Sequence, residues 1–343
     1  RVQVFITKSS MLCDDVREQL TLAGCEVQQP SWPPQTVPNW PPKSVLCLTW
    51  KQLVPLMLRE TSERRVGPAI PAHGASVDYA RFLAQYWPRL RPKARQLPAL
   101  LVWAEFNNRL RSFQSAWGET CKLKNYLEDN LAAVGIRLDE EDLKTVYELF
   151  KMYTGMKKSS RELDDTDVAM LIRARAPQAC VQQLYIDEAQ DFSPTELVLL
   201  MSLCQDGNGV TVAGDTCQTI NPGSAFNFKE IADVFIEFGG AGMTGREDRI
   251  DFKDQAKECR LLQLRCNYRS PASVAAFAGS VSRLLLDRFP TSADRLDETS
   301  LQIAGKLPLF IELPGVSPAS CIMGQGPHRL AGLHPARVAI LVR

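Results

Sequence analysis

The chain has 343 residues, 45% of them hydrophobic, so it can bury a large core and is long enough for two or three structural units. Its 40 basic side chains balance 39 acidic ones, and the net charge of +1 by itself points to neither a nucleic acid nor a membrane partner. No stretch approaches the roughly 20 apolar residues of a membrane helix, and ten cysteines without a C-x-x-C pair favour a reducing intracellular compartment, nucleus or cytoplasm.

The N-terminal pattern predicts a strand followed by a helix. Residues 2–7 favour β-structure, and Ser9 can cap a helix whose apolar residues Leu12, Val16 and Leu20 share one face. Six prolines between residues 30 and 42 then exclude regular structure. Because the sequence begins without Met and ends in a strand-like run, we expect it to be a fragment of a longer protein.

The next segment, residues 30–175, is predicted to be a mainly helical insertion, because apolar residues recur at helical spacing from about Val45 to Arg175. Within it, residues 81–124 carry nine basic side chains, only two acidic ones and several interleaved aromatic residues. Basic charge could follow a nucleic-acid backbone while aromatic faces stack on bases. Alternatively, the aromatic residues build a core and the arginines line its solvated face.

Alternation of strands and helices returns in the central part of the chain. Strand-like runs at residues 181–186 and 209–213 flank a helix that has an N-cap Ser193, a proline and a capping-box Glu196. A further strand-like run at residues 261–264 precedes Ser270-Pro271, which again has the chemistry of a helix start. This rhythm predicts an α/β fold with a parallel sheet.

Two adjacent carboxylates, Asp187 and Glu188, follow the strand at residues 181–186. In open parallel sheets, ligands bind outside the carboxyl ends of the strands. One carboxylate could hold Mg²⁺ and its neighbour could activate the water that attacks a γ-phosphate. The plainer interpretation is a strand end with solvated acidic residues.

Two later strand ends also carry polar side chains. After residues 209–213 come Gly214, Asp215 and Gln218, whose amide could sense a terminal phosphate, although a simple turn would use the same residues. Tyr268 and Arg269 precede the last predicted helix, where Arg could contact phosphate and Tyr could stack on a base. A surface ion pair is the alternative for Arg269.

Taken together, the runs D-E-A-Q-D, G-D-T-x-Q-T-I and L-x-x-N-Y-R-S resemble motifs II, III and IV of the UvrD/Rep-like superfamily 1 helicases. Residues 4–9 resemble motif Ia of that family. Residues 180–343 also resemble the UvrD-like module of large eukaryotic TPR and ankyrin repeat-containing proteins, whereas residues 43–175 resemble it only loosely.

The resemblance implies a RecA-like P-loop NTPase core with a helical insertion and the start of a second RecA-like lobe. Residues 1–29 and 176–256 would form the first lobe, residues 30–175 the insertion, and residues 257–343 the beginning of the second lobe. ATP and Mg²⁺ would be the cofactors, and single-stranded DNA or RNA the partner, with protein partners through the rest of a longer chain. The roles implied are Asp187 as the Mg²⁺ ligand, Glu188 as the catalytic base, Gln218 as the γ-phosphate sensor, Arg269, Tyr268, Gln190 and Asp215 as nucleotide-site residues, and Thr7, Lys8 and Ser9 as nucleic-acid contacts.

Two family features are missing from the sequence. No G-x-x-x-x-G-K-[ST] loop occurs, although the family has one just upstream of motif Ia, and the late motifs are also absent. We therefore expect an ATP-dependent helicase by family, of which this fragment alone hydrolyses ATP slowly or not at all. The alternatives are a catalytically inactive helicase-like interaction module of a repeat protein and a P-loop ATPase that is not a helicase.

Overall fold

The computed structural model describes residues 2–28, 45–63, 76–111, 121–132, 138–175, 177–205, 207–218, 228, 261–289, 299–300 and 307–308. The chain divides into two compact units. The first comprises residues 1–263 with 282–296, and the second comprises residues 264–281 with 297–343.

A five-stranded parallel sheet forms the centre of the first unit, with the strand order β2-β3-β1-β4-β5. β1 (Gln3–Thr7) pairs with β3 (Val45–Thr49) on one side and with β4 (Gln183–Ile186) on the other. β2 (Val27–Gln28) and β5 (Val210–Val212) complete the sheet. The prediction of an α/β fold with a parallel sheet is confirmed.

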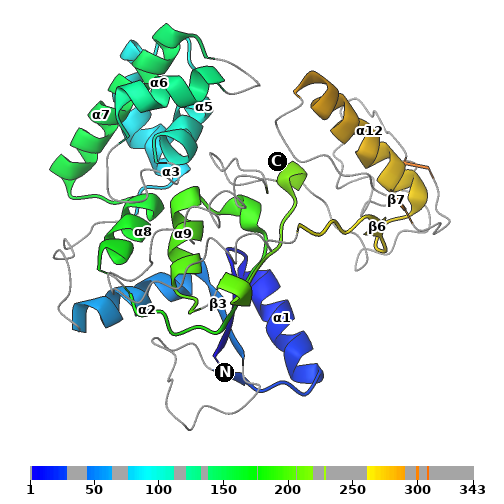
Figure 1. Cartoon of the computed structure of the whole chain (residues 1–343). Helices are drawn as coiled ribbons and strands as arrows, with labels where there is room; N and C mark the ends of the chain where they lie inside the picture. The colour runs from blue at the N-terminus through cyan, green and yellow to red at the C-terminus, as the bar shows by residue number, and fades with distance from the viewer. Residues whose placement is uncertain are drawn as a thin grey trace, which may run out of the picture. The chain divides into compact units, whose positions relative to one another are not determined.

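Helices cover both faces of this sheet, as an all-parallel sheet requires. α1 (Ser10–Leu22) lies on one face, while α2 (Trp50–Glu63), α8 (Asp165–Ala174) and α9 (Pro194–Ser202) lie on the other (Figure 1). The alternation of side chains along the strands explains the layers. Val4 and Ile6 face α2, α8 and α9, whereas Phe5 packs toward α1.

The insertion forms a helical group with a core of its own, seen as the cyan and green helices that include α3, α5, α6 and α7 (Figure 1). Phe82, Phe106 and Tyr153 are fully buried and contact one another through their rings. The helical elements are α3 (Tyr79–Arg81), a π-helical turn (Phe82–Tyr86), α4 (Trp87–Leu90), a 3-10 turn (Arg91–Lys93), α5 (Ala99–Ala104), a second π-helical turn (Glu105–Arg109), α6 (Leu123–Ala132) and α7 (Glu140–Ser160).

A buried cluster of charges joins the helical group of residues 79–160 to α8. Asp164, the N-cap of α8, receives two hydrogen bonds from the guanidinium of Arg111 at 2.6 and 2.7 Å and one from Lys157 at 2.5 Å. Burial alone would raise the pKa of Asp164, but these two cations outweigh it and hold the pKa well below its usual value. Asp167 shows the opposite balance, because burial and the neighbouring Asp164 raise its pKa.

The range predicted for the insertion, residues 30–175, includes a strand and two helices of the sheet layer, namely β3, α2 and α8. β3 at residues 45–49 is completely buried and lies in the sheet beside β1, and α2 packs on that sheet. The apolar run of β3 continues directly into the helical pattern of α2, and periodicity cannot separate a short buried strand from a helix start. Only the pairing with β1 makes the distinction.

In the second unit, β6 (Cys266–Asn267) pairs in parallel with β7 (Thr299–Ser300), and α12 (Ala272–Arg288) begins just after Ser270-Pro271, as predicted. The strand predicted at residues 261–264 is wrong. Leu264 is 94% exposed, and the ladder begins only at Cys266, because strand pairing depends on a partner strand that the sequence pattern does not reveal.

Candidate functional site

The carboxyl ends of β1 and β4 lie side by side at the centre of the sheet. Ile6 is in register with Ile186, and the amide of Asp187 donates to the carbonyl of Ile6 at 3.0 Å. The chain leaves β1 toward β2 and β3 on one side, and leaves β4 toward β5 on the other. Such a reversal of direction creates the crevice in which open α/β sheets bind ligands. The position of the strands therefore makes this edge the candidate site.

The backbone around Asp187 and Glu188 turns sharply at the end of β4. One carboxylate oxygen of Asp187 accepts the amide of Glu188 at 2.9 Å, and Glu188 has a left-handed backbone with φ 53°. A non-glycine residue in this region costs about 1–3 kcal/mol and needs support from its surroundings. The support includes the amide of Ala189, which donates to the carbonyl of Ala213 at 3.0 Å. Both carboxylates remain partly exposed.

Gln190 connects this turn to the end of β5. Its side chain is 1% exposed, its Nε2 donates to the carboxylate of Glu188, and its Oε1 accepts the amide of Asp215 at 3.1 Å. Because the amide of Asp215 can only donate, it fixes which end of the Gln190 amide faces Glu188. A Cβ atom on Gly214 would lie 2.6 Å from Oε1 of Gln190, so this close approach requires glycine.

Asp215 extends the hydrogen-bonded chain to Gln218. Its carboxylate accepts the amide of Cys217 at 2.9 Å and the side-chain Nε2 of Gln218 at 2.7 Å. Gln218 itself is exposed. The structure thus brings Asp187, Glu188, Gln190, Asp215 and Gln218 to one edge of the sheet, through contacts between strand ends that are about two dozen residues apart in sequence.

Thr7, Lys8 and Ser9 follow β1 at the same edge, but their contacts are internal. Thr7 is fully buried and its hydroxyl accepts the amide of Ser9 at 3.3 Å. Ser9 caps α1 by accepting the amide of Leu12 at 3.2 Å. The Nζ of Lys8 forms an ion pair of 2.9 Å with Glu196 in the first turn of α9. In this structure Thr7 and Ser9 therefore build the turn between β1 and α1, while Lys8 connects that turn to α9.

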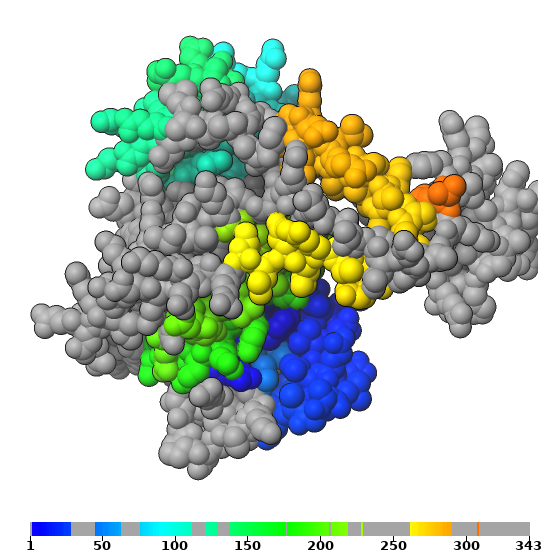
Figure 2. Space-filling view, turned by 45° about the vertical axis from the view of Figure 1, so that its right-hand side comes forward, coloured from blue at the N-terminus to red at the C-terminus, as the bar shows by residue number. Residues whose placement is uncertain are grey.

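Tyr268 and Arg269 belong to the second unit, whose segment at residues 264–281 is coloured yellow in Figure 2. Tyr268 is 72% exposed, and a hydrogen bond with Cys266 raises its pKa. The side chain of Asn267 accepts the amides of Arg269 at 3.0 Å and Ser270 at 2.9 Å. Asn267 therefore shapes the turn into α12 and leaves the side chains of Tyr268 and Arg269 at the surface.

The aromatic residues of the predicted basic and aromatic segment mostly build the core of the insertion. Tyr86 and Trp103 are buried in it and Trp87 packs against it, as the plainer interpretation predicted. Arg111 is buried in the charge cluster, whereas most of the other basic side chains of the segment are exposed. The exposed members are Arg89, Arg91, Lys93, Arg95, Arg109, Lys122 and Lys124.

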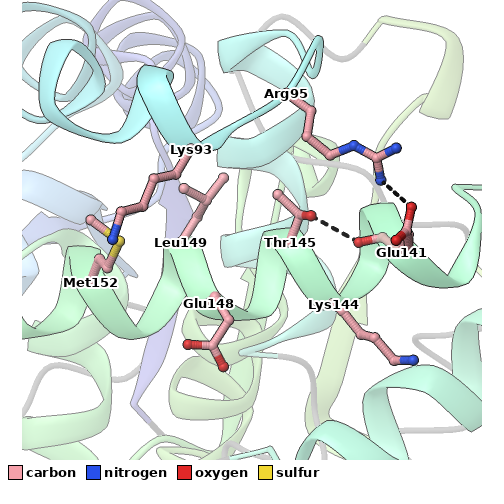
Figure 3. Close-up of a pocket in the computed structure, with 8 residues that line it drawn as sticks. All are labelled: Lys93, Arg95, Glu141, Lys144, Thr145, Glu148, Leu149 and Met152. Carbon is pink, nitrogen blue, oxygen red and sulfur yellow. Dashed lines mark hydrogen bonds and ion pairs between the residues drawn. The ribbon is translucent and has the colours of Figure 1, made fainter.

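A groove of about 570 Å³ lies between the turn at residues 91–95 and α7 (Figure 3). Arg95 and Glu141, which both line the groove, form an ion pair of 3.1 Å, whereas Lys144 pairs at 2.6 Å with Glu140, which lies outside the lining. Leu149 and Met152 contribute its apolar lining. The groove contains none of the residues at the edge of the sheet and does not belong to the candidate site.

Glu196 and Gly214 are two residues whose importance sequence reasoning missed. Glu196 was predicted as a capping-box residue, and the structure bears this out, but nothing in the sequence indicates its ion pair with Lys8, 188 residues away. Gly214 was predicted only as a turn residue. Its contact with Gln190 follows from the folding of two strand ends onto each other.

No known family profile matches the chain. The sequence is similar to TPR and ankyrin repeat-containing protein 1 of Homo sapiens, with 28% identity over 267 residues. The matched region is 76% of this chain but only 9% of the human protein. Among the helices that the structure describes, none combines the length and the apolar character needed to cross a bilayer.

Proposed function

We propose that this chain carries the hydrolytic half of an ATP site in a UvrD-like, superfamily 1 helicase or translocase acting on single-stranded nucleic acid. The five-stranded sheet would then be the core of a RecA-like lobe. The observation that carries the proposal is the hydrogen-bonded chain from Glu188 through Gln190 and Asp215 to Gln218, next to Asp187 at the switch point of the sheet.

The oxygen atoms at this edge fit magnesium better than a transition metal. Among the described residues, no group of three His, Cys, Asp or Glu side chains is arranged to hold a metal ion. Mg²⁺ does not need such a group, because one or two carboxylates, water and substrate phosphates usually complete its coordination. Asp187 uses one carboxylate oxygen for the amide of Glu188, and its other oxygen has no hydrogen-bond partner among the residues that the structure describes. When bound with ATP, Mg²⁺ neutralises charge on the phosphates.

The contacts of Glu188 suit a general base. Gln190 donates to one oxygen of the Glu188 carboxylate, and its own orientation is fixed by the amide of Asp215. A carboxylate held as an acceptor can take the proton of an attacking water with its second oxygen. The side chain of Gln218 is exposed, and among the described residues its Nε2 donates only to the carboxylate of Asp215. The Gln218 amide could exchange this contact for one with a phosphate.

The exposed basic side chains of the insertion support a nucleic-acid partner. Arg89, Arg91 and Lys93 are exposed within five residues of one another and have no ion pair among the described residues. A polyanion would gain affinity by releasing counterions at such a strip, so binding should weaken as salt increases. A threefold Ala substitution of these residues should weaken oligonucleotide binding and flatten its salt dependence, measured by fluorescence anisotropy.

The decisive experiment measures nucleotide binding and turnover in the full-length protein that contains this chain, with and without oligonucleotide. Asp187→Asn should weaken Mg²⁺-dependent ATP binding, while Glu188→Gln should keep binding and lower turnover by about 10²–10⁴-fold. Asp15→Asn, on the exposed face of α1, is the matched control for loss of an acidic charge. Turnover that is unchanged in Glu188→Gln would refute the assignment of the base.

A second candidate function is a catalytically inactive, helicase-like interaction module. The observation that favours it is the similarity to a TPR and ankyrin repeat-containing protein. The same binding experiment separates the two candidates. Full-length protein that binds no Mg²⁺-nucleotide at millimolar concentrations would support the module and exclude the motor.

A further inference from the structure

Lys8 lies 2.9 Å from a buried carboxylate rather than facing solvent. Its Nζ contacts Oε2 of Glu196, whose side chain is 1% exposed, and it lies 5.1 Å from the centre of the Phe192 ring. The Lys8 side chain is itself only 21% exposed. Both of its partners belong to the segment that begins at Glu188 and enters α9.

Glu196 depends on Lys8 for its charge balance. Its Oε2 accepts the amide of Ser193 at 2.6 Å as well as Lys8, whereas its buried Oε1 has no hydrogen-bond partner among the described residues. Lys8 is the one cation within ion-pair distance of Glu196 in the described part of the chain. Without it, a buried carboxylate would lose its counterion, and such losses are strongly destabilising.

The pKa of Asp165, a nearby carboxyl group, is affected by its burial and by both Glu196 and Lys8. Burial raises the pKa of Asp165, the negative charge of Glu196 raises it further, and Lys8 opposes that rise. Lys8 therefore neutralises a region to which α8 and α9 both contribute acidic side chains. A lysine engaged in this way has little capacity to contact a second anion such as a nucleic-acid phosphate.

The position of Lys8 links β1 to the turn that carries the candidate base. Phe192 directly follows the 3-10 turn Ala189–Asp191, is fully buried, and packs edge to face against Trp50 at 6.1 Å. Ser193 begins the capping box of α9. Since Glu188 precedes this turn with a left-handed backbone, its position depends on how firmly the next five residues are held.

We propose that Lys8 is a positioning residue that, through Glu196 and Phe192, holds the turn at residues 188–193 and thereby orients Glu188. The catalytic part of this inference rests on the proposed function, whereas the effect on the turn does not. The role differs from the nucleic-acid contact that the sequence resemblance implies for Lys8.

The test compares Lys8→Met, Lys8→Arg and Glu196→Gln in the full-length protein, with Lys51→Met as a control for loss of an exposed lysine. Hydrogen exchange of peptides covering residues 187–197 reports on the turn, and fluorescence anisotropy with a single-stranded oligonucleotide reports on binding. We expect Lys8→Met and Glu196→Gln to accelerate exchange of these amides at least about tenfold. Lys8→Arg and Lys51→Met should stay near wild type, and oligonucleotide affinity should change less than about twofold in every variant.

Turnover reports on Glu188 separately from a general loss of stability when kcat is expressed per folded molecule, with the folded fraction of each variant measured by circular dichroism. Lys8→Met should lower kcat for ATP at least about tenfold while KM changes less than about twofold, with rescue in Lys8→Arg. Unchanged exchange in Lys8→Met, or a loss of oligonucleotide affinity without faster exchange, would overturn the proposal. If wild-type protein shows no turnover, the proposed function fails, and faster exchange in Lys8→Met would still support the effect of Lys8 on the turn.

Discussion

Replacing Gly214 by Ala should destabilise the protein at the contact between the ends of β4 and β5. The new Cβ would lie 2.6 Å from Oε1 of Gln190 and 3.1 Å from the backbone N of Ala189. The Gln190 side chain cannot retreat without losing its hydrogen bond to the amide of Asp215, worth about 1 kcal/mol. Overpacking of a buried contact costs a further 1–3 kcal/mol, roughly, so we expect a total of about 2–4 kcal/mol.

Gly155→Ala is a matched control for this substitution. Gly155 lies inside α7, and a Cβ there would meet no atom within 4 Å, so alanine should stabilise the helix by about 1 kcal/mol. Urea unfolding, followed by far-ultraviolet circular dichroism, should therefore move the two midpoints in opposite directions. A Gly214→Ala midpoint at or above that of wild type would refute the reasoning.

A double-mutant cycle identifies the atom responsible. In a Gln190→Ala background the 2.6 Å contact no longer exists, so Gly214→Ala should cost less than in wild type. Equal costs in the two backgrounds would assign the effect to the backbone of Ala189 instead.

Two further predictions concern the joint between the insertion and the sheet. Asp164→Asn should lower the free energy of unfolding at pH 7 by about 3–5 kcal/mol, since it leaves Arg111 and Lys157 buried without their main counterion. The pKa of Asp164 in the folded protein lies well below its unfolded value, so the contribution of Asp164 to the free energy of unfolding is complete above about pH 4 and is lost as pH falls further. Asp164→Asn should therefore flatten the acid side of a plot of the free energy of unfolding against pH. Thr195→Val should cost about 1–3 kcal/mol in urea unfolding, because the buried Thr195 hydroxyl donates to the carbonyl of Arg111 at 3.0 Å; unfolding equal to wild type would show that this bond contributes nothing.

Local chemistry made several elements predictable from the sequence. Ser9 caps α1, and Ser193 with Glu196 forms the capping box of α9, because these contacts join residues only three positions apart. The α/β class followed from alternating strand and helix patterns. The placement of Asp187 and Glu188 at a strand end followed from the apolar run before them. The roles of these two carboxylates in catalysis remain predictions.

The sequence alone therefore determined those features whose energy comes from neighbouring residues, namely helix starts, strand periodicity and the order of the polar strand ends. Tertiary structure decided the rest. The membership of β3 in the sheet, the approach of Gly214 to Gln190 and the ion pair of Lys8 with Glu196 all join segments distant in the chain. Their physical basis is burial, because an unpaired strand edge or an uncompensated charge in the interior is costly until a distant partner reaches it.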